Sequence, residues 1–219
     1  MSLADIGAKY KANKPSGVFR WYEGLFAAYH GADRNLLEIG VKEGNSIRTW
    51  YDYGPRLHIH GLDLDITQIE GTLPEDRVEI GKVDQGSRES LESATKGRSY
   101  DIIIDDGSHW CSHQQLTLGY LFPKLKPGGV YIIEDLHTSQ WDRPSAKEFH
   151  EDCLGPSDMT TYFLQGMGRR DYVSRFILDS EMGYLQQNIL DLALHSCCFH
   201  KSGYRHNWGM SQQACIWKR

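Results

Sequence analysis

One stretch, residues 100–141, constrains the fold most, because it reads as a strand, a helix and a second strand. Residues 101–105 (DIIID) are a short apolar run that ends in acid, as expected of a buried parallel strand. Residues 110–125 carry leucines and a tyrosine at helical spacing, and residues 126–129 (KPGG) stop that helix. Residues 130–133 (VYII) form the second buried run. So compact a unit makes its two strands parallel, which predicts an α/β fold on a mostly parallel sheet.

Both strands end in pairs of acids, Asp105-Asp106 and Glu134-Asp135. The carboxyl ends of parallel strands meet at one edge of the sheet, where open α/β folds bind ligands. Buried carboxylates that lack partners are costly, so this cluster needs a cation, protons or strong donors. Oxygen ligands without cysteine favour Mg²⁺, with Mn²⁺ or Ca²⁺ as alternatives. An acid cluster held by hydrogen bonds alone is the competing interpretation.

One geometric condition applies to the metal hypothesis. Adjacent residues of a strand point to opposite faces of the sheet. Glu134 and Asp135 can therefore share an ion only if the strand ends there and the chain bends.

Length and composition limit the remaining possibilities. At 219 residues with a net charge of −5, the chain is expected to form one domain. No basic cluster suggests nucleic-acid binding, and no long apolar run suggests a membrane span. Five cysteines without disulfide or zinc spacing indicate a reduced, cytoplasmic setting. Within the domain we expect a helical cap over residues 1–34, a core over 35–141, and helices with closing strands over 142–219.

A glycine turn follows the first predicted strand, residues 35–40 (NLLEIG), and leads into a helix from about residue 46 to 53. Gly40 and Gly44 allow the backbone to approach a ligand, and the helix start offers free N–H groups. The dinucleotide pattern G-x-G-x-x-G fails because Lys42 occupies its second glycine position, which disfavours an NAD oxidoreductase. Glu38, two residues before Gly40, can accept hydrogen bonds or balance a positive ligand. A tight turn without a ligand is the alternative.

Acids also end the next two predicted strands. Residues 58–65 (HIHGLDLD) contain Asp63, about twenty residues after the glycine turn, which is the spacing of an acid that binds ribose hydroxyls. Residues 77–83 precede Asp84, which can accept a bond from an exocyclic amine such as that of adenine. Solvated acids at strand ends are the simpler alternative for both.

The ends of the chain are less specific. Residues 3–10 and 18–29 are expected to be helical, with a loop at 11–17. Residues 145–148 (SAKE) have the form of a capping box, and helices are expected there, around 158–165 and over 171–187. Residues 189–200 and 211–217 read as an antiparallel pair of strands with a loop at 204–209.

Taken together, these motifs resemble a known family. LLEIGVKEGNS, GLDLD, DQGSRESL, YDIIIDDGSH and LFPKLKPGGVYIIEDLHTSQW are similar to class I S-adenosylmethionine-dependent methyltransferases. More narrowly, they resemble the Mg²⁺-dependent sugar O-methyltransferases of macrolide and aminocoumarin biosynthesis (the mycinamicin, tylosin and novobiocin type). The resemblance implies a Rossmann-like, seven-stranded sheet of order 3-2-1-4-5-7-6 with helices on both faces and the last strand antiparallel. It also suggests a homodimer.

The resemblance assigns roles to individual residues. The cofactor-binding set would be Glu38, Gly40, Gly44, Ser46, Asp63, Asp84, Gln85 and Asp106. The metal ligands would be Asp106, Glu134 and Asp135, and His109 would be the catalytic base. His113 is expected to have a supporting or structural role, and Trp141 either lines the acceptor pocket or packs in the core.

The expected reaction is methyl transfer from the sulfonium of S-adenosylmethionine to a hydroxyl. A sugar hydroxyl is a poor nucleophile, and both a divalent cation and a neutral histidine can activate it. Two rival functions stay open: a metal-independent small-molecule methyltransferase and a non-catalytic S-adenosylmethionine-binding protein. The acceptor is not identified beyond a glycosylated natural product or a glycan. Because only 34 residues precede the first strand, no large auxiliary domain is expected before it.

Overall fold

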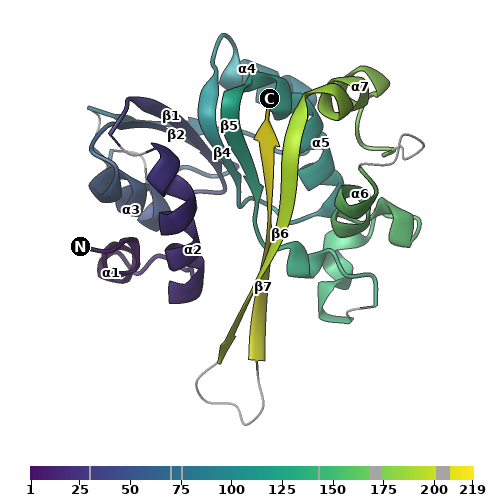
Figure 1. The fold of residues 1–219 in the computed structure, drawn as a ribbon, viewed down its shortest axis with the longest axis horizontal. Helices are drawn as coiled ribbons and strands as arrows, with labels where there is room; N and C mark the ends of the chain where they lie inside the picture. The colour runs from purple at the N-terminus through teal and green to yellow at the C-terminus, as the bar shows by residue number, and fades with distance from the viewer. Residues whose placement is uncertain (30, 70, 75, 143, 168–173, 201–207) are drawn as a thin grey trace.

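The structure is a computed structural model that describes residues 1–219 apart from 30, 70, 75, 143, 168–173 and 201–207. In the described part, the strands form one seven-stranded sheet of order β3-β2-β1-β4-β5-β7-β6 (Figure 1). The strands are β1 (Arg34–Ile39), β2 (Leu57–Asp63), β3 (Val78–Lys82), β4 (Tyr100–Asp105), β5 (Leu125–Ile133), β6 (Ile189–His200) and β7 (Trp208–Lys218). Strands β1 to β5 are parallel, and β7 is antiparallel to both of its neighbours. This confirms the expected fold class and strand order.

The register brings the strand ends to one edge. Asp105, the last residue of β4, pairs with Ile39 at the end of β1 and with Ile133 at the end of β5. The residues that follow these strands therefore emerge side by side, as the sequence predicted for the acids.

Helices cover both faces of the sheet (Figure 1). They are α1 (Leu3–Lys9), α2 (Ser16–Phe26), α3 (Asn45–Tyr53), α4 (Arg88–Thr95), α5 (Cys111–Leu121), α6 (Thr160–Gly166) and α7 (Asp179–Asn188), with short 3₁₀ turns η1 (Ala27–Tyr29), η2 (Phe122–Lys124), η3 (Leu136–Thr138), η4 (Pro144–His150) and η5 (Pro156–Asp158). Among the described residues, none of these helices is long and apolar enough to cross a membrane.

Neighbouring strand residues supply two separate cores, because side chains alternate between faces. Ile102 and Ile104 pack with residues of α1, α2 and α3, such as Trp50, whereas Ile103 packs with residues of α4 to α7, such as Leu118. All five of these side chains are fully buried. The sheet is thus packed between two apolar layers, and this packing holds the strand ends that carry the acids in place.

Several predicted boundaries were wrong. The helix expected to reach residue 125 ends at Leu121, two residues before Pro123, which lacks the N–H that an α-helix needs. Strand β5 begins at Leu125, and its register with β4 shifts over the KPGG segment. The capping-box segment forms the 3₁₀ turn η4 and no α-helix.

The remaining differences lie near the C-terminus. Residues 174–178 are not helical, so the helix expected over 171–187 begins only at Asp179; residues 171–173 lie outside the described part. Of the expected loop at 204–209, Trp208 and Gly209 belong to β7, and 204–207 are not described.

Candidate active site

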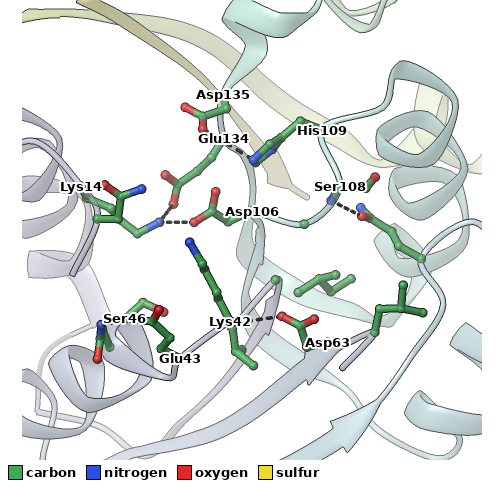
Figure 2. Close-up of a pocket in the computed structure, with 18 of the residues that line it drawn as sticks. Lys14, Lys42, Glu43, Ser46, Asp63, Asp106, Ser108, His109, Glu134 and Asp135 are labelled. Atoms are coloured by element: carbon green, nitrogen blue, oxygen red, sulfur yellow. Dashed lines mark hydrogen bonds and ion pairs between the residues drawn. The ribbon is translucent and has the colours of Figure 1, made fainter. Parts of the chain in front are cut away.

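A cavity of about 510 Å³ opens at the carboxyl edge of the parallel strands. Most of the site residues predicted from the sequence line it, namely Gly40, Ser46, Asp63, Asp84, Gln85, Asp106, His109, Glu134 and Asp135. Glu38 and Gly44 lie close by but are not part of the lining. Figure 2 shows side chains that converge on it from the segments after β1, β4 and β5, together with Asp63 at the end of β2 and Lys14 from the connection between α1 and α2.

The glycine turn needs glycine for a steric reason. Gly40 has a φ of +87°, and a Cβ there would lie 2.0 Å from the backbone oxygen of Asp106. Gly44 has a φ of +74° and precedes the first turn of α3. The backbone of the β1–α3 turn therefore packs directly on the residues that follow β4, and Gly40 also borders the cavity.

Glu38 lies in β1, two residues before Gly40, and is fully buried. Its Oε2 accepts hydrogen bonds from Ser46 Oγ at 3.0 Å and Trp50 Nε1 at 2.9 Å, while its Oε1 has no partner among the described atoms. Burial raises the pKa of this carboxyl to about 8. An unpaired buried oxygen of this kind suits a cationic or hydrogen-bond-donating ligand.

The acids at the ends of β2 and β3, Asp63 and Asp84, each accept a hydrogen bond from a backbone N–H. Asp63 Oδ2 accepts a hydrogen bond from the backbone N–H of Lys42 at 2.7 Å, which ties the turn to β2. Asp84 is exposed, and its Oδ1 accepts from the Gly86 N–H at 2.9 Å. Both carboxylates still border the cavity.

Gln85 has its side-chain amide committed inside the protein. Its Nε2 donates to Asp105 Oδ1 at 2.6 Å, and its Oε1 accepts from the Ser108 N–H at 2.9 Å. Burial raises the pKa of Asp105 to about 7. Gln85 therefore positions the loop after β4, a role that the sequence did not reveal.

A buried lysine joins two of the predicted metal ligands. Lys14 Nζ lies 2.5 Å from Asp106 Oδ2 and 2.6 Å from Glu134 Oε1 (Figure 2). The side chain of Lys14 is only 5% exposed. Burial alone would lower its pKa, but the Asp106 and Glu134 carboxylates outweigh this and raise it well above the ordinary value. Glu134 Oε1 also accepts from Tyr22 Oη at 2.6 Å.

Asp135 lies beside His109 in the acid cluster. The strand ends at Ile133, and Asp135 has a φ of +54°, so the chain bends where the metal hypothesis requires it. Its Oδ2 lies 3.6 Å from His109 Nε2. His109 also has a left-handed backbone (φ +62°), and its buried Nδ1 has no partner among the described atoms.

The donor set fits a divalent ion. Asp106, His109 and Asp135 each offer one ligand atom, and these atoms lie within 4.8 Å of one another. The two carboxylates are ligands that Mg²⁺ and Mn²⁺ prefer, whereas an imidazole is a more usual ligand of transition metals, which leaves His109 available for another role. Glu134 is not in this group, and its Oε1 instead accepts from Lys14 and Tyr22.

Two further residues organise the loop after β4. Ser108 Oγ lies 2.9 Å from His113 Nδ1, and the rings of His113 and Trp110 stack at 5.7 Å. His113 therefore has a supporting position.

Trp141 is 39% exposed and lies against the His150 ring, at 5.6 Å between centroids.

Comparisons with known proteins agree with this geometry. No protein-family model matches the chain. It is 29% identical over 223 residues to mycinamicin VI 2''-O-methyltransferase of Micromonospora griseorubida, a match that covers 95% of the chain and 54% of that relative. It is 32% identical over 163 residues to 8-demethyl-8-alpha-L-rhamnosyl tetracenomycin-C 2'-O-methyltransferase of Streptomyces olivaceus, which covers 70% and 42%. The chain is a relative of the antibiotic sugar O-methyltransferases.

A solved structure supports the same relationship. The MycE methyltransferase of the mycinamycin pathway, in complex with Mg, SAH and mycinamycin VI, matches with a TM-score of 0.72 and 27% identity. The match covers the whole chain and 54% of MycE. The chain shares the class I methyltransferase fold with MycE, and it spans about half the length of the curated relatives it matches.

Proposed function

We propose that this chain carries out S-adenosylmethionine- and Mg²⁺-dependent O-methylation of a sugar hydroxyl in a glycosylated natural product or a glycan. The observation that carries the proposal is the grouping of Asp106, His109 and Asp135 beside the cavity of the glycine turn. The names of the relatives support the sugar acceptor, and the Mg and SAH of MycE support the cofactors.

The residues around the glycine turn would hold S-adenosylmethionine. Gly40 and Gly44 would let the backbone approach it, and Ser46 borders the same space. Asp63 would accept from the ribose hydroxyls, and Asp84 and Gln85 would lie by the adenine, with the free Oε1 of Glu38 accepting from the methionine part.

The acid cluster would hold the ion and position the acceptor. Bound Mg²⁺ would supply a Lewis acid that lowers the pKa of the acceptor hydroxyl. Asp106 and Asp135 would bind it directly, and Glu134 would use Oε2, since its Oε1 is engaged by Lys14 and Tyr22. His109 would take the proton of the hydroxyl as the methyl group is transferred in line.

The test combines calorimetry with methyl transfer. S-adenosylhomocysteine is titrated with and without Mg²⁺, and transfer from labelled S-adenosylmethionine is measured on a panel of glycosides. We expect Asp106→Asn to lose the Mg²⁺ signal, and His109→Gln to slow transfer by about 10²–10⁴ while still binding the cofactor. His58→Gln and Asp179→Asn, exposed residues outside the cavity, serve as matched controls. A protein that binds no S-adenosylhomocysteine would rule the proposal out.

A metal-independent methyltransferase is the second candidate. It is favoured by Lys14, whose ammonium already places a positive charge between Asp106 and Glu134. Transfer that continues unchanged in excess chelator would select this candidate.

Two less specific expectations belong to the same proposal. A cytoplasmic location is supported by Cys111, Cys153 and Cys215, which are free thiols in the structure. The homodimer rests on the family resemblance and is tested by analytical ultracentrifugation.

A further inference from the structure

Lys14 is an ionised group in the site that the proposed reaction does not use. It comes from the connection between α1 and α2, one residue before the Pro15 N-cap of α2. Its ammonium lies within 2.6 Å of carboxylate oxygens from two different strand ends, Asp106 after β4 and Glu134 after β5. The lysine therefore connects the N-terminal helices to the acid cluster.

The charges around this ammonium do not balance. Asp106 and Glu134 contact it directly. Within the described residues, Asp106 and Glu134 form ion pairs with no other lysine or arginine. One ammonium thus faces two carboxyl groups, and additional positive charge beside them would be favourable.

Asp106 is the residue that both cations would share. Its Oδ2 contacts Lys14, and the same residue belongs to the group with His109 and Asp135 that can hold a divalent ion. A cation held by the same carboxylate would be repelled by the ammonium, because like charges repel strongly where little water separates them.

We propose that Lys14 is an internal counter-ion of the metal site, which offsets part of the negative charge of Asp106 and Glu134 and thereby weakens the binding of the divalent ion. The inference rests on the proposed function, because it concerns the same metal site. A purely structural role for Lys14 predicts the opposite effect, since loss of its two contacts would disorder Asp106 and weaken metal binding.

The test measures binding of Mn²⁺ alone, from the loss of the free-ion signal in electron paramagnetic resonance. Wild type is compared with Lys14→Met and with Lys14→Gln, which keeps a hydrogen-bond donor but loses the charge. Lys11→Met is the matched control, because Lys11 is exposed, lies in the same connection and also borders the cavity. Unfolding temperatures with and without Mn²⁺ are recorded for all four proteins.

We expect both Lys14 variants to bind Mn²⁺ at least about tenfold more tightly than wild type, and Lys11→Met to stay within about twofold. The Lys14 variants should unfold at lower temperature without metal and recover when it is added. If a Lys14 variant folds but binds Mn²⁺ as weakly as wild type or more weakly, the inference is overturned, while the proposed function stays intact. If wild type and variants alike bind no Mn²⁺, the metal part of the proposed function fails and the inference falls with it.

Discussion

Gly40 and Gly44 form a matched pair for substitution, because both have left-handed backbones in very different surroundings. A Cβ at Gly40 would lie 2.0 Å from the backbone oxygen of Asp106. At Gly44 the nearest atoms are the ends of side chains, 3.2 Å away on Arg48 and 3.3 Å away on Ile69. Side-chain ends can move aside, whereas the backbone at the end of β4 cannot without shifting the sheet edge.

The two costs can be compared. A left-handed backbone with a Cβ costs about 1–2 kcal/mol at either position. The overlap at Gly40 adds about 1–3 kcal/mol, the range for overpacking. We therefore expect Gly44→Ala to lose about 1–2 kcal/mol and Gly40→Ala about 2–5 kcal/mol of unfolding free energy. In a chain of this size each kcal/mol lowers Tm by about 2–4 °C.

Thermal unfolding followed by circular dichroism measures the difference directly. Calorimetry with S-adenosylhomocysteine adds a second readout, since Gly40→Ala must push the turn away from Asp106 and weaken cofactor binding more than Gly44→Ala does. Equal losses of stability in the two variants would show that the close contact of the turn with β4 does not limit the structure.

Two predictions concern buried titratable groups of the sheet, His60 in β2 and Asp101 in β4. His60 is 6% exposed and lies 2.8 Å from Tyr100 Oη, and burial lowers its pKa from 6.5 to about 4. Unfolding lets His60 bind a proton at higher pH, so stability should fall by up to about 3 kcal/mol between pH 6.5 and 4, and urea unfolding of His60→Gln should show a correspondingly flatter pH profile. Asp101, 4% exposed, accepts from the Asn35 N–H at 2.9 Å, so Asp101→Asn should cost about 1–3 kcal/mol in urea unfolding. The exposed Asp33→Asn should cost less than about 1 kcal/mol, and similar losses would contradict the role of burial.

The sheet could be predicted from the sequence because its signals are local. Each buried apolar run is short and continuous, and each parallel strand is followed by an acid or a glycine turn. The bend at Asp135 was required by the alternation of side chains and is present as a left-handed residue. The α-helix expected at the capping box is the 3₁₀ turn η4 instead. The conformation of so short a segment depends on tertiary packing more than on local signals, which the sequence pattern does not show.

The electrostatics of the site could not be predicted, because they depend on contacts between distant residues. Lys14 is 92 residues from Asp106 and 120 from Glu134 along the chain, and its surroundings, KANKPSG, read only as a loop. Gln85 was expected by the adenine, yet its amide joins Asp105 to Ser108. Both polar groups have partners that only the folded chain supplies.

The position of β7 has a consequence for how the chain folds. It lies between β5 and β6 in the sheet but follows both in sequence. During synthesis, the twelve residues of β6 therefore leave the ribosome before the strand that pairs with them, and one edge of β5 also waits for β7. Unpaired strand edges invite association with other chains. We expect the interval before β7 emerges to be the stage of biogenesis at which this protein depends most on chaperones.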